Sequence, residues 1–267
     1  MGRALRHHRQ VGWFHVMNRG AGRRAIFLSD RDRVEFGKAL GEACERFAVE
    51  VHAYCLMTNH FHLLVRCPDG HLSEMMQWLQ AVVTRRFNAR LASDGPILRG
   101  RFRSKEVDSD AYLLATTRYI HANPVPILQG APLDSYRWSS LRTYLGHRRS
   151  PAWMHTEVVL EMFGDDRIAF TEFMAQPLSG LAPTIIEAIT GFALEEFGDE
   201  IAAAAHLERT VLLVAAAELG DDAAPLLEHL GFGGRHQIRQ ATWRAKRRAE
   251  QQPLLLDVAH RVLRSAA

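Results

Sequence analysis

The sequence predicts an α+β protein: a ferredoxin-like βαββαβ antiparallel sheet with helices on one face, followed by an all-α C-terminal domain. The first part rests on the order in which strand-like and helix-like apolar patterns follow one another between residues 12 and 107. The second part rests on the loss of strand signals after Pro151, where alanine, leucine and glutamate dominate. We expect the sheet domain in residues 1–146, a linker region in 147–180 and the helical domain in 181–267.

Short patterns predict the elements of the first domain in turn. GWFHVMN at residues 12–18 predicts a strand, and Ser29 to Asp32 resembles a capping box that starts a helix ending near residue 48. Residues 49–67 predict a hairpin whose turn is Thr58-Asn59. A helix of about 20 residues should follow, with one apolar stripe made of Leu72, Met76, Leu79, Val83 and Phe87.

The last elements of this domain carry basic and polar side chains. ILRGRFRSKEV, which follows Gly95-Pro96, predicts a fourth strand with its basic side chains on one face and Phe102 on the other. A further helix over 108–123 must end before Pro124, because the residue before a proline is pushed out of helical geometry.

Charge is distributed in three blocks. Residues 1–150 hold 23 Lys and Arg against 13 Asp and Glu, residues 151–234 hold 2 against 15, and residues 235–267 hold 8 against 2. One basic block alone is often only a solvated surface, but two separated blocks favour a polyanionic partner. Near the end of the sequence, DDAAPLLEHLGF and RHQIRQATWRAKRRAE flank Gly233-Gly234, a pattern typical of a helix-turn-helix with a basic second helix. An ordinary basic surface helix is the alternative.

Composition argues against several classes of protein. No apolar run approaches the roughly 18 residues of a membrane span, and no apolar segment of a secretion signal follows the basic start. Cys44, Cys55 and Cys67 are odd in number and lack CxxC spacing, which argues against a disulfide framework and a thiolate zinc site. We expect a cytoplasmic protein with no membrane partner.

Four residues could carry chemistry. His60 and His62 flank Phe61 on a predicted strand, so both imidazoles project from one face and could converge on a metal ion. With 14 histidines in the chain, about 0.7 such triplets arise by chance, so the motif alone is weak. Tyr119 and Asn123 are four apart and share one face of a helix. Taken singly, Tyr119 could be core packing and Asn123 a helix end tolerant of unusual backbone angles.

The combination resembles a known family. The segments FHVMNRGAGRRAIF, DRDRVEF, AYCLMTNHFHLLV, GRFRSKEVD, RYIHANPV and WSSLRTYLG follow one another between residues 10 and about 146. They resemble the single-tyrosine HUH transposases, in particular the REP-associated tyrosine transposases of bacteria. The resemblance implies that His60 and His62 bind a divalent metal, that Tyr119 is the nucleophile, and that Asn123 occupies the place of the third ligand. One departure is NPVP, where the family usually has a basic residue after Val125.

The resemblance also implies a reaction, and the residue types suit it. Tyr119 would attack a DNA phosphate, leaving a 5′-phosphotyrosine and a free 3′ hydroxyl for rejoining. A phenol is mostly protonated at pH 7, so the metal should orient and polarise the phosphate. Two imidazoles and an amide leave the metal open: magnesium or manganese is expected, and nickel or zinc would suit the ligands as well.

The expected partner is single-stranded or hairpin DNA, for example the hairpins of repetitive extragenic palindromes. With such a partner we expect the protein at the nucleoid. The tail bears a looser resemblance to the helix-turn-helix domain of the bacterial replication initiator, through LLEHLGFGGRHQIRQATWRAK. The candidate DNA contacts are basic or polar side chains of both regions, namely Arg19, Arg23, Arg24, Arg99, Arg101, Arg103, Lys105, Arg235, His236, Gln237 and Arg239.

Two other functions compete with the transposase reading. A catalytically silent DNA-binding regulator would keep the fold and work through the basic tail. A metal-dependent hydrolase of another phosphodiester would use the histidines but not Tyr119. A monomer and a homodimer are both compatible with the sequence, because Tyr119 could complete the histidine pair of its own chain or of a partner. A close pair within one chain would argue for action in cis.

Overall fold

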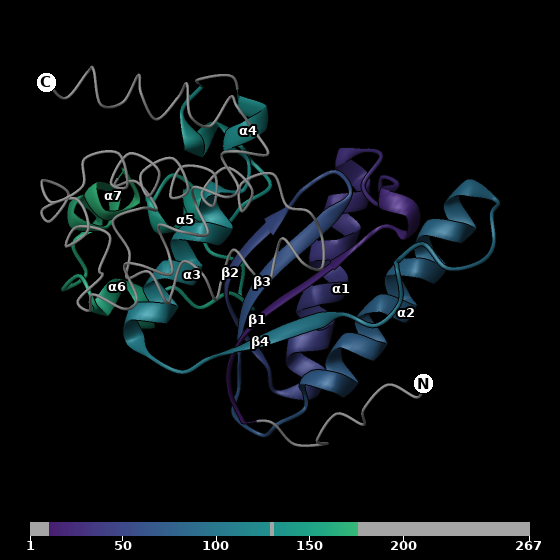
Figure 1. The fold of residues 1–267 in the computed structure, drawn as a ribbon, viewed down its shortest axis with the longest axis horizontal. Helices are drawn as coiled ribbons and strands as arrows, with labels where there is room; N and C mark the ends of the chain where they lie inside the picture. The colour runs from purple at the N-terminus through teal and green to yellow at the C-terminus, as the bar shows by residue number, and fades with distance from the viewer. Residues whose placement is uncertain (1–10, 129–130, 176–267) are drawn as a thin grey trace, which may run out of the picture. The chain divides into compact units, whose positions relative to one another are not determined.

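The computed structural model describes residues 11–128 and 131–175, which form one unit (Figure 1). Four antiparallel strands lie in the order β2-β3-β1-β4, with β1 at Gly12–Arg19, β2 at Glu50–Leu56, β3 at His60–Cys67 and β4 at Arg103–Val107. Helix α1 (Asp30–Phe47) joins β1 to β2, and α2 (Leu72–Leu91) joins β3 to β4. The predicted ferredoxin-like βαββαβ order is confirmed. The helical domain expected at 181–267 lies outside the described residues.

Local chemistry starts and ends α1 where the sequence predicts. The Asp32 carboxylate accepts hydrogen bonds from the Ser29 backbone N–H and the Ser29 hydroxyl, at 2.8 and 3.0 Å. This capping box satisfies a backbone donor that has no partner within the helix. The helix stops at Ala48, which adopts a left-handed backbone conformation.

Helices α1 and α2 pack on one face of the sheet and form the core with it. Phe14 and Val16 of β1 and Phe61 and Leu63 of β3 point to this face and are buried, and the Phe36 ring of α1 lies 5.0 Å from the Phe61 ring. The buried residues of α2 are Leu72, Met75, Met76, Leu79 and Val82. The apolar stripe is therefore rotated slightly from the predicted one, and Val83 and Phe87 are only half-buried.

Strand β4 is shorter than predicted. The expected strand ran from Ile97 to Val107, but regular pairing with β1 covers only Arg103–Val107. The reason lies at Gly100, whose φ of +132° interrupts extended backbone. Leu98 pairs with Gly20 only as an isolated bridge. Phe102 is buried, as the prediction required.

The opposite face of the sheet carries helix α3 (Asp110–Ala122). Ser109 caps it, because its hydroxyl accepts a hydrogen bond from the Tyr112 N–H at 3.4 Å. The helix ends at Ala122, Asn123 is its C-cap residue, and a short helix α4 (Val125–Leu128) follows. Figure 1 shows α3 on the other side of the strands from α1 and α2. This placement brings the last turn of α3 toward β3.

Residues 131–175 cover the edge strand β2. The Trp138 carbonyl accepts from the Leu56 N–H at 2.9 Å, the Ser140 hydroxyl accepts from the Tyr54 N–H at 2.8 Å, and the Tyr144 hydroxyl donates to the His52 carbonyl at 2.6 Å. Three short helices lie in this segment: α5 (Leu141–Tyr144), α6 (Glu157–Glu161) and α7 (Arg167–Ala175). An otherwise open strand edge thus finds partners within the chain.

Helix α7 is fixed to α3 by a buried arginine. The Arg118 guanidinium donates to the Phe173 carbonyl at 3.2 Å, and its central carbon lies 4.6 Å from the centre of the Phe173 ring. Residues 147–175, the first part of the segment expected as a linker, therefore pack on the sheet domain, and residues 176–180 lie outside the described part of the chain.

Cys44, Cys55 and Cys67 are buried and form no disulfide. Among the residues that the structure describes, no helix has both the length and the apolar composition that a membrane crossing requires.

Stability of this unit should fall in mild acid because two histidines are buried as neutral rings. Burial lowers the pKa of His121 to about 3, and that of His52 to about 4. The folded pKa values lie below the unfolded value of about 6.5, so the stabilisation is present above pH 6.5 and is lost progressively toward pH 3 to 4. Each histidine should cost about 2 kcal/mol at pH 5.

Hydrogen exchange followed by mass spectrometry, corrected for intrinsic exchange rates, measures this loss in peptides from β2 and α3 of the full chain. We expect lower protection at pH 5 than at pH 7, and a smaller difference in His121→Gln. His147→Gln, at an exposed position, is the control. Equal protection of the wild-type protein at both pH values would contradict the prediction.

Candidate functional site

Strand β3 places two imidazoles on the α3 face of the sheet. Because side chains alternate along a strand, Phe61 points into the core while His60 and His62 point the other way. The two imidazole rings lie 5.1 Å apart, centre to centre. His62 is fully buried and His60 is half-buried.

The last turns of α3 add a phenol and an amide to the same place. The Tyr119 ring lies 5.6 Å from the His62 ring, edge to face, and Tyr119 is fully buried. The Asn123 side-chain oxygen Oδ1 lies 3.4 Å from Nε2 of His60. The structure thus brings His60, His62, Tyr119 and Asn123 together within one chain.

Asn123 is explained better by this contact than by its backbone. Its φ and ψ of −49° and −35° are those of a right-handed helix, so the expectation that Pro124 pushes this residue out of helical geometry is wrong. An asparagine tolerant of left-handed geometry is therefore not needed here. Its Nδ2 donates to the Tyr119 carbonyl at 3.0 Å, which turns Oδ1 toward His60.

The hydrogen bonds at His60 leave two lone pairs facing each other. The Asn59 side-chain oxygen lies 2.7 Å from Nδ1 of His60 and can only accept, so Nδ1 carries the proton. In a neutral His60 the lone pair is then on Nε2, and it faces Oδ1 of Asn123, which is also an acceptor. A divalent cation between these two atoms would be bound by both lone pairs.

The donor set fits a divalent metal. Two imidazole nitrogens and an amide oxygen suit Mn²⁺, Ni²⁺ or Zn²⁺, and Mg²⁺ would accept them less readily. In the described part of the chain, no three His, Cys, Asp or Glu side chains gather to hold a metal, and the present set uses an amide as its third ligand. His60, His62 and Asn123 are the residues that would hold the ion.

His15 is a member of this site that sequence reasoning missed. It lies on β1, is fully buried, and its Nε2 is 3.0 Å from Nδ1 of His62. Its ring also lies 5.7 Å from the Tyr119 ring. The only signal in the sequence was a polar residue between Trp13 and Met17 on an otherwise apolar strand face, and the register that pairs Met17 with His62 is visible only in the structure.

The basic residues predicted to contact DNA fall into separate groups. Arg103 and Lys105 pair with Met17 and His15 across β1 and β4, so they lie on the α3 face of the sheet, and Arg19 pairs with His60. Arg99 and Arg101 are exposed but precede β4, so strand alternation does not place them. Arg235, His236, Gln237 and Arg239 lie outside the described residues.

Two further arginines follow β1. Arg24 donates to the carbonyls of Pro96 and Ile97, which ties it to the loop before β4. Arg23 is exposed, and its carbonyl accepts from the Asn59 side chain at 3.3 Å. Arg23 is thus the more accessible of the two for a phosphate.

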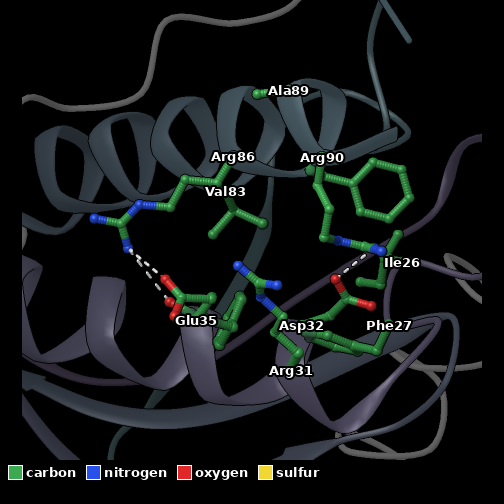
Figure 2. Close-up of a pocket in the computed structure, with 11 residues that line it drawn as sticks. Ile26, Phe27, Arg31, Asp32, Glu35, Val83, Arg86, Ala89 and Arg90 are labelled. Atoms are coloured by element: carbon green, nitrogen blue, oxygen red, sulfur yellow. Dashed lines mark hydrogen bonds and ion pairs between the residues drawn. The ribbon is translucent and has the colours of Figure 1, made fainter. Parts of the chain in front are cut away.

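A cavity of about 450 Å³ lies between α1 and α2 (Figure 2). These helices lie on the other side of the sheet from α3, which carries Tyr119 (Figure 1). Three arginines line it, Arg31, Arg86 and Arg90. Arg86 contacts Glu42 at 3.1 Å and Glu35 at 3.9 Å, and Arg90 contacts Asp32 at 2.6 Å. The cavity is lined by residues of α1, α2 and the segment before α1, and it is separate from the histidine site.

Comparison with known proteins finds similarity over the part of the chain that carries His60, His62, Tyr119 and Asn123. Residues 10–123 match a family model described as "Transposase IS200 like", and this match ends at Asn123. Residues 10–123 are therefore similar to the IS200-like transposases. No curated protein matches the chain.

Two solved structures are similar to this chain. One is a REP-associated tyrosine transposase bound to a REP hairpin, with 16% identity, 58% of this chain and 92% of that chain covered, and a TM-score of 0.46. The other is a predicted transposase from Deinococcus radiodurans R1, with 16% identity, 45% and 95% covered, and a TM-score of 0.33.

The metal-site hypothesis predicts that Asn123→Ala weakens Mn²⁺ binding. Removing Oδ1 takes away one of three ligands, and we expect the dissociation constant to rise roughly tenfold or more, equivalent to about 1.4 kcal/mol. Titration calorimetry measures it. Asn88→Ala is a matched control, because Asn88 also donates from Nδ2 to a backbone carbonyl, that of Gly95, but on α2. Equal Mn²⁺ affinity in Asn123→Ala and wild type would remove Asn123 from the ligand set.

Proposed function

We propose that this protein is a metal-dependent DNA endonuclease and strand transferase with Tyr119 as its nucleophile. The proposal takes the similarity of residues 10–123 to the IS200-like transposases as its premise. One observation carries the proposal: His60, His62, Asn123 and Tyr119 converge from β3 and α3 of a single chain. Its substrate is single-stranded or hairpin DNA, as the resemblance to REP-associated transposases implies.

The chemistry follows from the residue types. The Tyr119 oxygen attacks a DNA phosphorus, a P–O bond to the tyrosine forms, and the bond from phosphorus to the 3′ oxygen breaks. The tyrosine loses its proton, and the departing 3′ oxygen gains one. The product is a 5′-phosphotyrosine with a free 3′ hydroxyl, which can attack in the reverse sense and rejoin a strand without an energy cofactor. A divalent ion held by His60, His62 and Asn123 would supply polarisation of the scissile phosphate.

Side chains of this protein would orient the groups that react in this step. Asn123 is held by its bond to the Tyr119 carbonyl, and both residues therefore move with the same helical turn. Tyr119 is fully buried in this structure, so a phosphate reaches its hydroxyl only after local displacement of the residues around it. Three basic side chains on the α3 face of the sheet, those of Arg19, Arg103 and Lys105, would attract the phosphate backbone of an approaching strand.

A covalent adduct with DNA tests the nucleophile. The purified protein, incubated with Mn²⁺ and labelled hairpin DNA from its own genomic neighbourhood, should give a protein–DNA adduct on denaturing electrophoresis. In Tyr119→Phe the adduct should fall by a factor on the order of 10³ or more, because no other group replaces the attacking oxygen. Tyr112→Phe is the matched control, since Tyr112 is a buried tyrosine two turns earlier on α3.

The other outcomes separate the competing functions. DNA cleavage that persists in Tyr119→Phe without an adduct would support a metal-dependent hydrolase. Salt-sensitive DNA binding with no adduct across a panel of metals and hairpins would support the silent DNA-binding regulator.

The site is proposed to act in cis, because the Tyr119 and His62 rings that lie 5.6 Å apart belong to one chain. A mixture of Tyr119→Phe and His62→Ala proteins should therefore remain inactive in the adduct assay. Each chain of the mixture lacks one half of the site. Recovery of the adduct on mixing would show that a partner chain supplies the tyrosine.

A further inference from the structure

We propose that His15 is a positioning residue that fixes the tautomer and ring orientation of His62. The inference rests on the proposed role of His62 as a metal ligand. The geometry behind it is the hydrogen bond between Nε2 of His15 and Nδ1 of His62, at 3.0 Å, between two fully buried rings.

Proton counting decides what this bond does. A neutral imidazole has one N–H and one lone pair, so one ring of the pair donates and the other accepts. If Nδ1 of His62 donates to His15, Nε2 of His62 keeps a lone pair and can bind a metal. In the opposite direction, Nε2 of His62 would carry the proton and could not bind one. A metal-binding His62 therefore requires His15 to be the acceptor.

His60, the neighbouring candidate ligand, has a similar hydrogen bond at its Nδ1, but to a different kind of acceptor. Nδ1 of His60 donates to the Asn59 side-chain oxygen at 2.7 Å, which leaves Nε2 of His60 facing Asn123. Metal-binding histidines commonly donate their second ring N–H to a partner that fixes the tautomer. In this site His15 takes that place for His62.

Packing adds an orientation constraint to the tautomer. Three rings lie close together, those of His15, His62 and Tyr119. Their centres are 5.2 Å apart for His15 and His62, 5.6 Å for His62 and Tyr119, and 5.7 Å for His15 and Tyr119. His62 cannot turn about its side-chain bonds without displacing one of the other two rings. His15 comes from β1, which pairs with β3 on one side and β4 on the other, so the sheet fixes its backbone position.

Nitrogen NMR of the metal-free, full-length protein reads the tautomer directly. With ¹⁵N-labelled histidine, and with His62→Gln used to assign the signals, we expect His62 to be protonated on Nδ1. In His15→Leu this preference should be lost. In His15→Gln it should persist, because the glutamine oxygen can accept the same hydrogen bond.

Mn²⁺ titration of the same proteins supplies a second measurement. His15→Leu should weaken binding by about 10- to 100-fold, as losing such a partner typically does, and His15→Gln should remain close to wild type. His52→Leu is the matched control: His52 is also fully buried, on β2, where it contacts Glu50 and Trp13. It should change neither the His62 tautomer nor the Mn²⁺ affinity.

Two results would overturn the inference: a wild-type His62 protonated on Nε2, or unchanged Mn²⁺ affinity in a folded His15→Leu. If that variant fails to fold, His15→Gln decides through its tautomer, and loss of the Nδ1-protonated form there counts against the proposal. Failure of the proposed function is distinguishable, because wild-type protein would then give no DNA adduct while the tautomer and the Mn²⁺ affinities follow the pattern above.

Discussion

Strand β3 has to serve two environments at once, and the rest of the structure depends on this constraint. Its odd-numbered residues, such as Phe61 and Leu63, fill the core beneath α1 and α2, while His60 and His62 point to the opposite face. A shift of one residue in register would exchange the two sets, burying imidazoles among apolar side chains. Pairing on both sides, with β1 and β2, prevents that shift. The histidines are therefore held by the same contacts that hold the core.

Sequence patterns predicted most of the sheet domain because the patterns are local. The capping box at Ser29 and the hairpin over 49–67 involve neighbours in the chain, and both were found. Strand β4 was predicted too long, because alternation continued through Gly100, whose backbone breaks the strand. His15 was missed for a different reason: its partner is 47 positions away, and only the register of β1 against β3 brings the two rings together.

The sheet face that carries α3 has polar side chains, but they are buried. Between β1, β3 and α3 the structure buries His15, His62, Tyr119 and Asn123, groups whose desolvation costs free energy unless their polar atoms are satisfied. Natural sequences accept such costs mainly where function requires them. Asn123 illustrates the choice, since its helical backbone would accept residues with better helix propensity, whereas its amide links the Tyr119 carbonyl to His60.

The covering of β2 by residues 138–140 has a consequence for the order of events during synthesis. Ser140 pairs with Tyr54 across 86 positions, and α3 reaches β3 only after both strands of the hairpin have been made. A chain emerging from the ribosome can therefore form the β2–β3 hairpin while its outer edge is still unpaired, a state prone to pairing with other chains. Such distant contacts form slowly because loop closure must precede them. His60 and His62 are therefore synthesised before Tyr119, and the site can be completed only after α3 has left the ribosome.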